Sequence, residues 1–370
     1  MRGESVYIWQ LAGWPDFRFD AARMALALAS LHESRGRMHA QLGSLGLASR
    51  DEATLQCLTE DALRTSEIEG ETLDGEAVRS SFARRLGVEV TRHRAASRSV
   101  DGLVEVLLDA LWKCRDPVTE PRLFGWHASL FPSGFSGLSR IEVGTWRTGR
   151  TGAMRVVSGP HGKQKVHFEA PPAERVRQEM AAFLAWINGS PSVDPVVRSG
   201  LAHLWFVTVH PFADGNGRIA RALGDLLLAR LDGEAGRFYS VSSQIAAERS
   251  DYYERLERTQ KGTLDVTEWL EWYVGCVSRA VGRGLESARG VASRADFWSR
   301  HAAVPFNARQ TRVIRRFLLD FEGNLTAAKW AKLAKCSPDT ALRDLNDLIA
   351  KGVLRRSASG GRSTSYEVAD

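Results

Sequence analysis

The sequence is poor in cysteine and in long hydrophobic runs. Only 4 cysteines occur in 370 residues, and they are widely scattered without a CxxC pair. This usage excludes a disulfide framework and favours reduced thiols in a cytoplasmic location. No run reaches the roughly 18 apolar residues that span a bilayer, and no secretory apolar core follows the N-terminus, so we expect no membrane partner.

Most of the chain also lacks an excess of positive or of negative residues. The formal net charge is +6, and residues 305–370 alone carry 12 Lys and Arg against 7 Asp and Glu. The basic excess therefore lies near the C-terminal end and indicates an anionic partner there. With 44% hydrophobic and 25% charged residues, the composition is that of a globular protein with two or three domains.

One dense polar motif stands between two apolar segments. Residues 210–221 read His-Pro-Phe-Ala-Asp-Gly-Asn-Gly-Arg-Ile-Ala-Arg. The apolar residues 201–209 predict a buried helix that Pro211 ends, because proline lacks an N–H and clashes with the preceding turn. The spacing of Ile219 and the following leucines predicts a second helix. The pattern is therefore helix, glycine-bearing loop, helix.

The loop has the composition of a polyphosphate site. The backbone N–H groups of residues 215–217 can approach oxygen anions closely, and the following helix adds its positive end. Arg218 and Arg221 lie on one helical face and can grip successive phosphates. Asp214 suits Mg²⁺, and His210 suits taking a proton from a hydroxyl. The alternative is a capped helix with a packed histidine and two solvated arginines.

The same twelve residues resemble the signature of the Fic family, His-x-Phe-x-Asp/Glu-Gly-Asn-Gly-Arg-x-x-Arg, with every defined position filled. The resemblance implies a mainly α-helical bundle that transfers AMP from ATP to a Ser, Thr or Tyr hydroxyl of a protein. It implies that His210 is the catalytic base and Asp214 the Mg²⁺ ligand. The implied nucleotide-binding residues are Gly215, Asn216, Gly217 and Arg218 at the α- and β-phosphates, and Arg221 at the γ-phosphate.

An earlier helix, expected to end near Gly70, carries a second pattern. Residues 65–70 match the family's inhibitory pattern Ser/Thr-x-x-x-Glu-Gly/Asn at Thr65, Glu69 and Gly70. The resemblance implies autoinhibition, because a glutamate paired with Arg221 takes the place of the γ-phosphate. The alternative is a surface acid near a helix end, where the helix dipole mildly disfavours it.

A β-hairpin is expected before the motif. Residues 154–157 and 166–168 predict its two arms, with the turn at 158–162. The resemblance implies that this hairpin is a flap whose edge pairs with the target segment as an added strand. An unrelated surface hairpin is the alternative.

A helix expected over residues 244–260 carries two neighbouring tyrosines. The resemblance places this region beside the adenine and ribose, so Tyr252 and Tyr253 are candidate nucleotide-binding residues; two core tyrosines are the alternative. A long scaffold helix is expected from residue 266 to about 289. His127 and His203 are expected to be packed side chains rather than catalytic ones.

The last segment resembles a winged helix-turn-helix domain, with three helices and two short strands. If its partner is DNA, the third helix, residues 339–351, would enter the major groove. Protein docking is the alternative, because three acids on that helix oppose DNA. The expected phosphate contacts are Arg343, Arg355, Arg356 and Arg362, and the opposing acids are Asp339, Asp344 and Asp347.

The predicted domains are a helical module carrying the inhibitory helix (1–95), a Fic catalytic core (96–290), a linker (291–304) and a winged-helix-like domain (305–370). The predicted function is an autoinhibited protein adenylyltransferase that uses ATP and Mg²⁺ on a protein hydroxyl. The alternatives are removal of AMP by hydrolysis, transfer of another phosphate-linked group, and a DNA-binding regulator whose Fic body senses nucleotide. A homodimer is left open.

Overall fold

The computed structural model describes residues 6–90, 93–159, 164–190, 192–233, 237–321, 323–357 and 364–369. The chain is mostly helical and divides into two compact units, Met1–Ala288 and Arg289–Asp370. Within the described ranges, no helix is long and apolar enough to cross a membrane.

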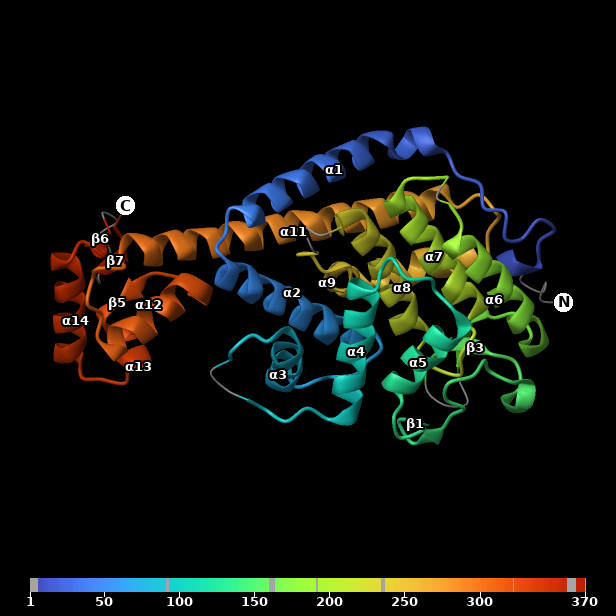
Figure 1. The fold of residues 1–370 in the computed structure, drawn as a ribbon, viewed down its shortest axis with the longest axis horizontal. Coiled ribbons are helices and arrows are strands. Elements are labelled where there is room, and N and C mark those ends of the chain that lie inside the picture. Colours follow the sequence, from blue (N-terminus) through green and yellow to red (C-terminus); the bar gives the residue numbers. More distant parts are fainter. Residues whose placement is uncertain are drawn as a thin grey trace. The chain divides into compact units, whose positions relative to one another are not determined.

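The first unit is a helical bundle with two small hairpins (Figure 1). Its helices are η1 (Ile8–Gln10), α1 (Ala21–Gly43), α2 (Leu47–Ile68), α3 (Gly75–Leu86), α4 (Arg98–Trp112), α5 (Glu120–Leu130), η2 (Gly149–Thr151), α6 (Ala173–Asn188), α7 (Pro195–Val209), α8 (Asn216–Asp232), α9 (Val241–Ala247), α10 (Arg249–Gln260) and α11 (Thr267–Arg300).

The pair α7 and α8 forms the centre of this bundle. Every residue of α7 from Val196 to Val209 is buried, and most of α8 is buried as well. Their apolar side chains share one core with those of α2, α4 and α5. The motif between α7 and α8 is therefore fixed by the best-packed part of the unit.

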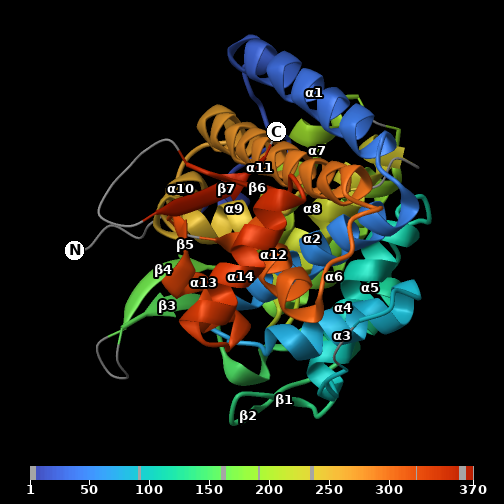
Figure 2. The ribbon, with the colours of Figure 1, turned by 90° about the vertical axis from the view of Figure 1, so that its left-hand side faces the viewer.

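The N-terminal arm packs on the bundle. The rings of Trp14 and Phe17 meet Trp205 of α7 edge to face. Figures 1 and 2 show α1 running along the first part of α11, where Arg23 and Glu271 form an ion pair at 2.6 Å.

The predicted hairpin is present. Strands β3 (Arg155–Ser158) and β4 (Lys165–Glu169) pair antiparallel, while residues 160–162 of the expected turn lie outside the described residues. A smaller hairpin, β1 (Phe135–Ser136) with β2 (Ser139–Arg140), precedes it in the chain.

The helix expected over 244–260 is two helices, so that prediction is wrong in detail. Ser240 caps α9 by accepting a hydrogen bond from the Ser243 N–H at 2.9 Å, which starts the helix earlier than expected. The chain then bends at Glu248, whose carboxylate accepts two hydrogen bonds from Arg279, both 2.6 Å long. This bidentate pair holds the bend between α9 and α10.

The scaffold helix is also longer than expected. It was predicted to end near residue 289, but α11 continues to Arg300 through most of the predicted linker 291–304. Phe297 explains the extension, because it is buried in the core of the second unit. A helical segment whose aromatic side chain is buried in a domain core is part of that domain and not a linker.

Among its described residues, the second unit contains the end of α11, three further helices and a three-stranded antiparallel sheet in the order β5-β7-β6. Residues 358–363, which include the turn expected at 359–362 and Arg362, lie outside the described residues. Its elements are α12 (Ala308–Asp320), β5 (Leu325–Thr326), α13 (Ala327–Ala334), α14 (Pro338–Ala350), β6 (Leu354–Arg356) and β7 (Ser365–Val368).

Candidate nucleotide-binding site

The site is built where α7 ends and α8 begins. His210 adopts a left-handed backbone conformation (φ 51°, ψ 57°) that ends α7, and Gly215 adopts another (φ 77°, ψ 3°) directly before α8. This region is strained for residues with a Cβ, so glycine suits position 215. A Cβ there would also lie only 2.8 Å from Cε2 of Phe131.

Arg147, from the segment before β3, holds this turn from behind. Its Nε donates to the carbonyl oxygen of His210 at 2.7 Å, and its Nη2 donates to the carbonyls of Val209 and Pro171. Its backbone N–H donates to the carbonyl of Pro211 at 2.8 Å. Burial lowers the pKa of Arg147 to about 10, which leaves it charged at neutral pH.

Asn216 closes the loop with its side chain. Its Oδ1 accepts from the Phe212 N–H and its Nδ2 donates to the Phe212 carbonyl, both at 2.9 Å. Phe212 is fully buried and stacks on His127 at 4.3 Å between ring centroids. Because the Asn216 amide is used inside the protein, only the backbone of this residue faces a ligand.

Arg221 is buried and bound to the end of α2. Its Nε donates to Oγ1 of Thr65 at 2.7 Å, and its Nη2 donates to the Thr65 carbonyl at 2.9 Å and to Oε1 of Glu69 at 2.7 Å. Its Nη1 is buried without a partner among the described residues. The same Glu69 oxygen would lie 2.2 Å from a Cβ at position 217, so only glycine lets the carboxylate approach the start of α8.

The end of α2 is a Schellman motif. The N–H of Gly70 donates to the carbonyl of Glu67 at 3.0 Å, and the N–H of Glu71 donates to that of Ser66 at 2.9 Å. Gly70 takes φ +83°, the left-handed conformation that this motif requires. The three pattern residues Thr65, Glu69 and Gly70 thus lie together at one helix end against α8.

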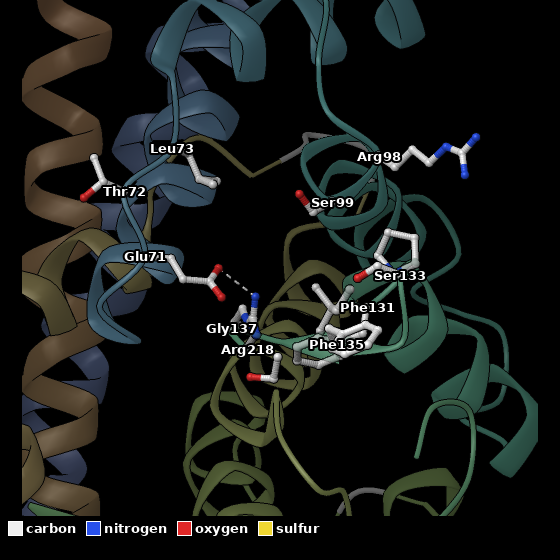
Figure 3. Close-up of a pocket in the computed structure, with 13 residues that line it drawn as sticks. Glu71, Thr72, Leu73, Arg98, Ser99, Phe131, Ser133, Phe135, Gly137 and Arg218 are labelled. Carbon is white, nitrogen blue, oxygen red and sulfur yellow. Dashed lines mark hydrogen bonds and ion pairs between the residues drawn. The ribbon is translucent and has the colours of Figure 1, made fainter. Parts of the chain in front are cut away.

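Arg218 faces a pocket of about 570 Å³ beside this contact (Figure 3). Its side chain is 6% exposed, its Cζ lies 5.0 Å over the Phe131 ring, and its Nη1 donates to Oε2 of Glu71 at 2.9 Å. The pocket is also lined by Arg98 and Ser136. Arg218 is therefore the buried cation of the motif that faces this pocket, which can take an anion.

The half-buried imidazole of His210 has one nitrogen engaged. Its Nδ1 lies 3.2 Å from the Val207 carbonyl oxygen, which favours the tautomer with the proton on Nδ1 and leaves Nε2 as the basic atom. Burial lowers the pKa of His210, and the positive charge of Arg147 lowers it further, while the Val207 carbonyl and the acids Glu69 and Asp214 raise it. The net shift is downward, so the imidazole is neutral and ready to accept a proton at neutral pH.

Asp214 is the acid of the loop. One oxygen accepts from the Gly215 N–H at 2.6 Å, and the other accepts from the hydroxyl of Ser136 in β1. No group of three or more His, Cys, Asp or Glu side chains gathers as a metal site within the described part of the chain. A single carboxylate beside a phosphate site fits Mg²⁺, which proteins commonly bind through one or two carboxylates and substrate phosphates.

The two candidate tyrosines differ. Tyr252 is 2% exposed, and its hydroxyl lies 2.9 Å from Nε2 of buried His203, so the structure corrects its assignment from an open stacking wall to the core. Tyr253 is 39% exposed and donates to the Ile68 carbonyl at 3.2 Å. Burial lowers the pKa of His203 to about 3, which keeps it neutral as a packed side chain.

Three residues of the site gave no usable signal in the sequence. Arg147, Ser136 and Glu71 act through partners 63, 78 and 147 positions away along the chain. A short Trp-Arg-Thr stretch, a loop serine and a surface acid are ordinary features, so only the fold shows that they meet the motif.

Comparison with known proteins supports the fold and the motif. Residues 117–228 match the model of the Fic/DOC family, and residues 7–88 match that of a domain of unknown function, DUF4172. A Fic family protein from Desulfovibrio desulfuricans shares 23% identity with a TM-score of 0.54, over 94% of this chain and 95% of that one. A Fic domain containing signaling protein from Bacteroides thetaiotaomicron shares 18% identity with a TM-score of 0.53, over 70% and 98% of the two chains.

Curated relatives match over the region of the motif. Protein adenylyltransferase Fic of Nematostella vectensis is 35% identical over 125 residues, which are 33% of this chain and 27% of that protein. Protein adenylyltransferase fic-1 of Caenorhabditis briggsae is 36% identical over 99 residues, 26% and 18% of the two chains. The chain thus spans about a quarter or less of the length of these relatives. Together these matches show that the chain carries a domain of the Fic/DOC family, with the loop between α7 and α8 inside it.

Proposed function

We propose that this protein is a protein adenylyltransferase, which transfers AMP from ATP to a Ser, Thr or Tyr hydroxyl of a target protein. The observation that carries the proposal is the site itself, where a neutral imidazole, a carboxylate and two buried arginines converge on one helix start. The names of the curated relatives agree with this activity.

The chemistry assigns one role to each group. Nε2 of His210 takes the proton of the target hydroxyl, whose oxygen attacks the α-phosphorus of ATP. The bond from that phosphorus to the bridging oxygen breaks, and pyrophosphate leaves with the electron pair. The N–H groups of residues 215–217, with Arg218 and Arg221, stabilise the charge on the phosphates. Mg²⁺ held by Asp214 supplies further neutralisation of that charge when bound.

The hairpin β3–β4 is the proposed docking edge for the target. Val157 and Val166 on its two strands are 39% and 40% exposed, although valine usually lies inside proteins. An extended target segment added as a further strand gains backbone hydrogen bonds there, which positions its hydroxyl.

Glu69 is the proposed inhibitor. Its carboxylate occupies Arg221 and lies against Gly217, so it competes with a phosphate for the same cation and the same helix start. Tyr253, half-exposed on α10 beside the Ile68 carbonyl, remains the proposed contact for the nucleoside.

The experiment compares wild type, Glu69→Gly and His210→Ala with ATP labelled on the α-phosphate. We expect Glu69→Gly to raise label transfer to protein about ten- to hundredfold, because it removes a charged hydrogen bond that competes with the substrate. Loss of the base should lower transfer by a factor of about 10²–10⁴. Equal labelling by all three proteins would refute the transferase assignment.

A second proposal concerns the second unit, whose partner we infer to be DNA. Two of the acids that would repel DNA have their charge balanced by an ion pair. Asp344 is buried and pairs with Arg309 at 3.1 Å, and Asp347 pairs with Lys351 at 2.6 Å. Arg343 on α14 stays exposed. A gel shift with the full chain that weakens steeply with salt supports this, and a shift that salt leaves unchanged contradicts it. A cytoplasmic location and a homodimer remain predictions.

A further inference from the structure

Both arginines of the motif are bound by acids from one helix end. Arg221 pairs with Glu69 at 2.7 Å, and Arg218 pairs with Glu71 at 2.9 Å. Figure 3 shows the second of these pairs, where a dashed line joins the Glu71 carboxylate to Arg218. Only the first pair belongs to the pattern that the sequence identified.

The Schellman motif fixes both acids at once. Gly70 in its left-handed conformation reverses the chain after Glu69, and the Glu71 N–H is tied back to the carbonyl of Ser66 at 2.9 Å. The side chains of Glu69 and Glu71 therefore extend from one rigid turn. They point toward Arg221 and Arg218, which lie on the same face of α8.

Arg218 is placed to receive an anion rather than to hold Glu71. Its guanidinium is positioned over the Phe131 ring at 5.0 Å, and its side chain is 6% exposed. Its Nε is buried with no partner among the residues that the structure describes. The Glu71 carboxylate pairs with Nη1 of Arg218, and its side chain is 47% exposed. The ion pair is therefore accessible to solvent, and another anion can replace Glu71.

We propose that Glu71 is a second inhibitory acid, which competes with a substrate phosphate for Arg218. This inference rests on the proposed function and adds a regulatory contact to it. Glu69 and Glu71 then act as two acids of one latch, and removing Glu69 alone leaves Arg218 occupied. Release of the Schellman turn frees both arginines together.

The test measures the affinity for ADP by calorimetry. Glu69→Gly is compared with Glu69→Gly/Glu71→Gln and with a matched control, Glu69→Gly/Glu67→Gln. Glu67 lies in the same last turn of α2 but pairs with Arg64 on the surface, where its side chain is 56% exposed. Both double variants therefore lose one further acid from the same helix end.

We expect Glu71→Gln to tighten ADP binding about three- to tenfold and Glu67→Gln to change it little, because only Glu71 competes for a buried cation of the site. The gain should shrink as salt rises from about 0.05 to about 0.5 M, since a half-exposed ion pair is screened.

Two outcomes overturn the inference in different ways. If Glu69→Gly binds ADP and transfers AMP, but Glu71→Gln and Glu67→Gln leave the affinity equal, Glu71 is not inhibitory and the proposed function stands. If none of the variants binds ADP, the proposed function fails and the second inhibitory role fails with it.

Discussion

At the scale of single residues, the proposed base, His210, depends on a side chain far from it in sequence. His210 has a strained backbone (φ 51°), and the Arg147 guanidinium binds the carbonyls on both sides of that turn. Strained residues persist where their surroundings over-determine them. Arg147 is therefore a positioning residue, which fixes where the imidazole of His210 points.

His210 also sets the pH dependence that we expect for label transfer by the Glu69→Gly variant. Burial lowers the pKa of His210 below the ordinary 6.5, and the negative charge of Glu69 partly opposes this shift. Removal of Glu69 therefore lowers the pKa of His210 further. The active form is the neutral base, so the rate is full above pH 6.5 and declines only below the shifted pKa, by about tenfold per pH unit. The measurement is the initial labelling rate from pH 4.5 to 8. An acid limb centred above pH 6.5 would contradict the assigned base.

The residues that the sequence predicted are those within a compact pattern. The twelve positions 210–221 carry the loop, and Thr65 and Glu69 of the second pattern lie within hydrogen-bond distance of Arg221, while their inhibitory role stays a prediction. Tyr252 was placed wrongly, because a buried tyrosine and a stacking tyrosine look alike in sequence. The Glu71 contact was missed because a surface acid next to a glycine carries no periodicity.

At the scale of elements, the end of α2 determines where the proposed inhibitory acids lie. Position 70, which follows Glu69, is glycine because the backbone there is left-handed, and not because a side chain would clash with a neighbour. A Cβ on Gly70 meets nothing within 4 Å, so a substitution costs only backbone strain.

This distinction gives a prediction for two variants of Gly70. Asparagine tolerates the left-handed region, whereas a β-branched residue does not, at a cost of roughly 1–2 kcal/mol. Gly70→Asn should therefore keep label transfer low, and Gly70→Val should raise it by loosening Glu69 and Glu71. Labelling and urea unfolding of both proteins measure this. Identical labelling by the two variants would show that the turn does not control the acids.

Helix positions were predicted well where both ends carry local signals. The end of α7 follows from the proline at position 211, whereas α9 and α10 separate at Glu248 because of an ion pair with Arg279 on another helix. The extension of α11 to Arg300 depends on the burial of Phe297. Both errors come from tertiary contacts that a single segment does not contain.

At the scale of the whole molecule, α2, the helix that carries the proposed inhibitory residues, is part of the core of the first unit. Leu55, Leu58 and Ala62 of α2 pack in the same core as α8. Asp61, one turn before Thr65, lies 3.7 Å from buried Arg237, which also pairs with Asp225 of α8. If Glu69 inhibits as proposed, we expect its release to be a local change at the last turn of α2 and not the undocking of the helix.

Two matched substitutions on α2 test this division. Asp61→Asn removes a charge that is 5% exposed and leaves Arg237 with one partner fewer, so it should lower the free energy of unfolding by about 3 kcal/mol. Glu69→Gln removes a charge from a side chain that is 29% exposed, and Arg221 keeps both contacts with Thr65, so it should cost less than about 1 kcal/mol while raising label transfer. Urea unfolding at neutral pH compares the two proteins. If Glu69→Gln destabilised the protein as much as Asp61→Asn, the inhibitory contact would be part of the structural core, and relief would require partial unfolding of the first unit.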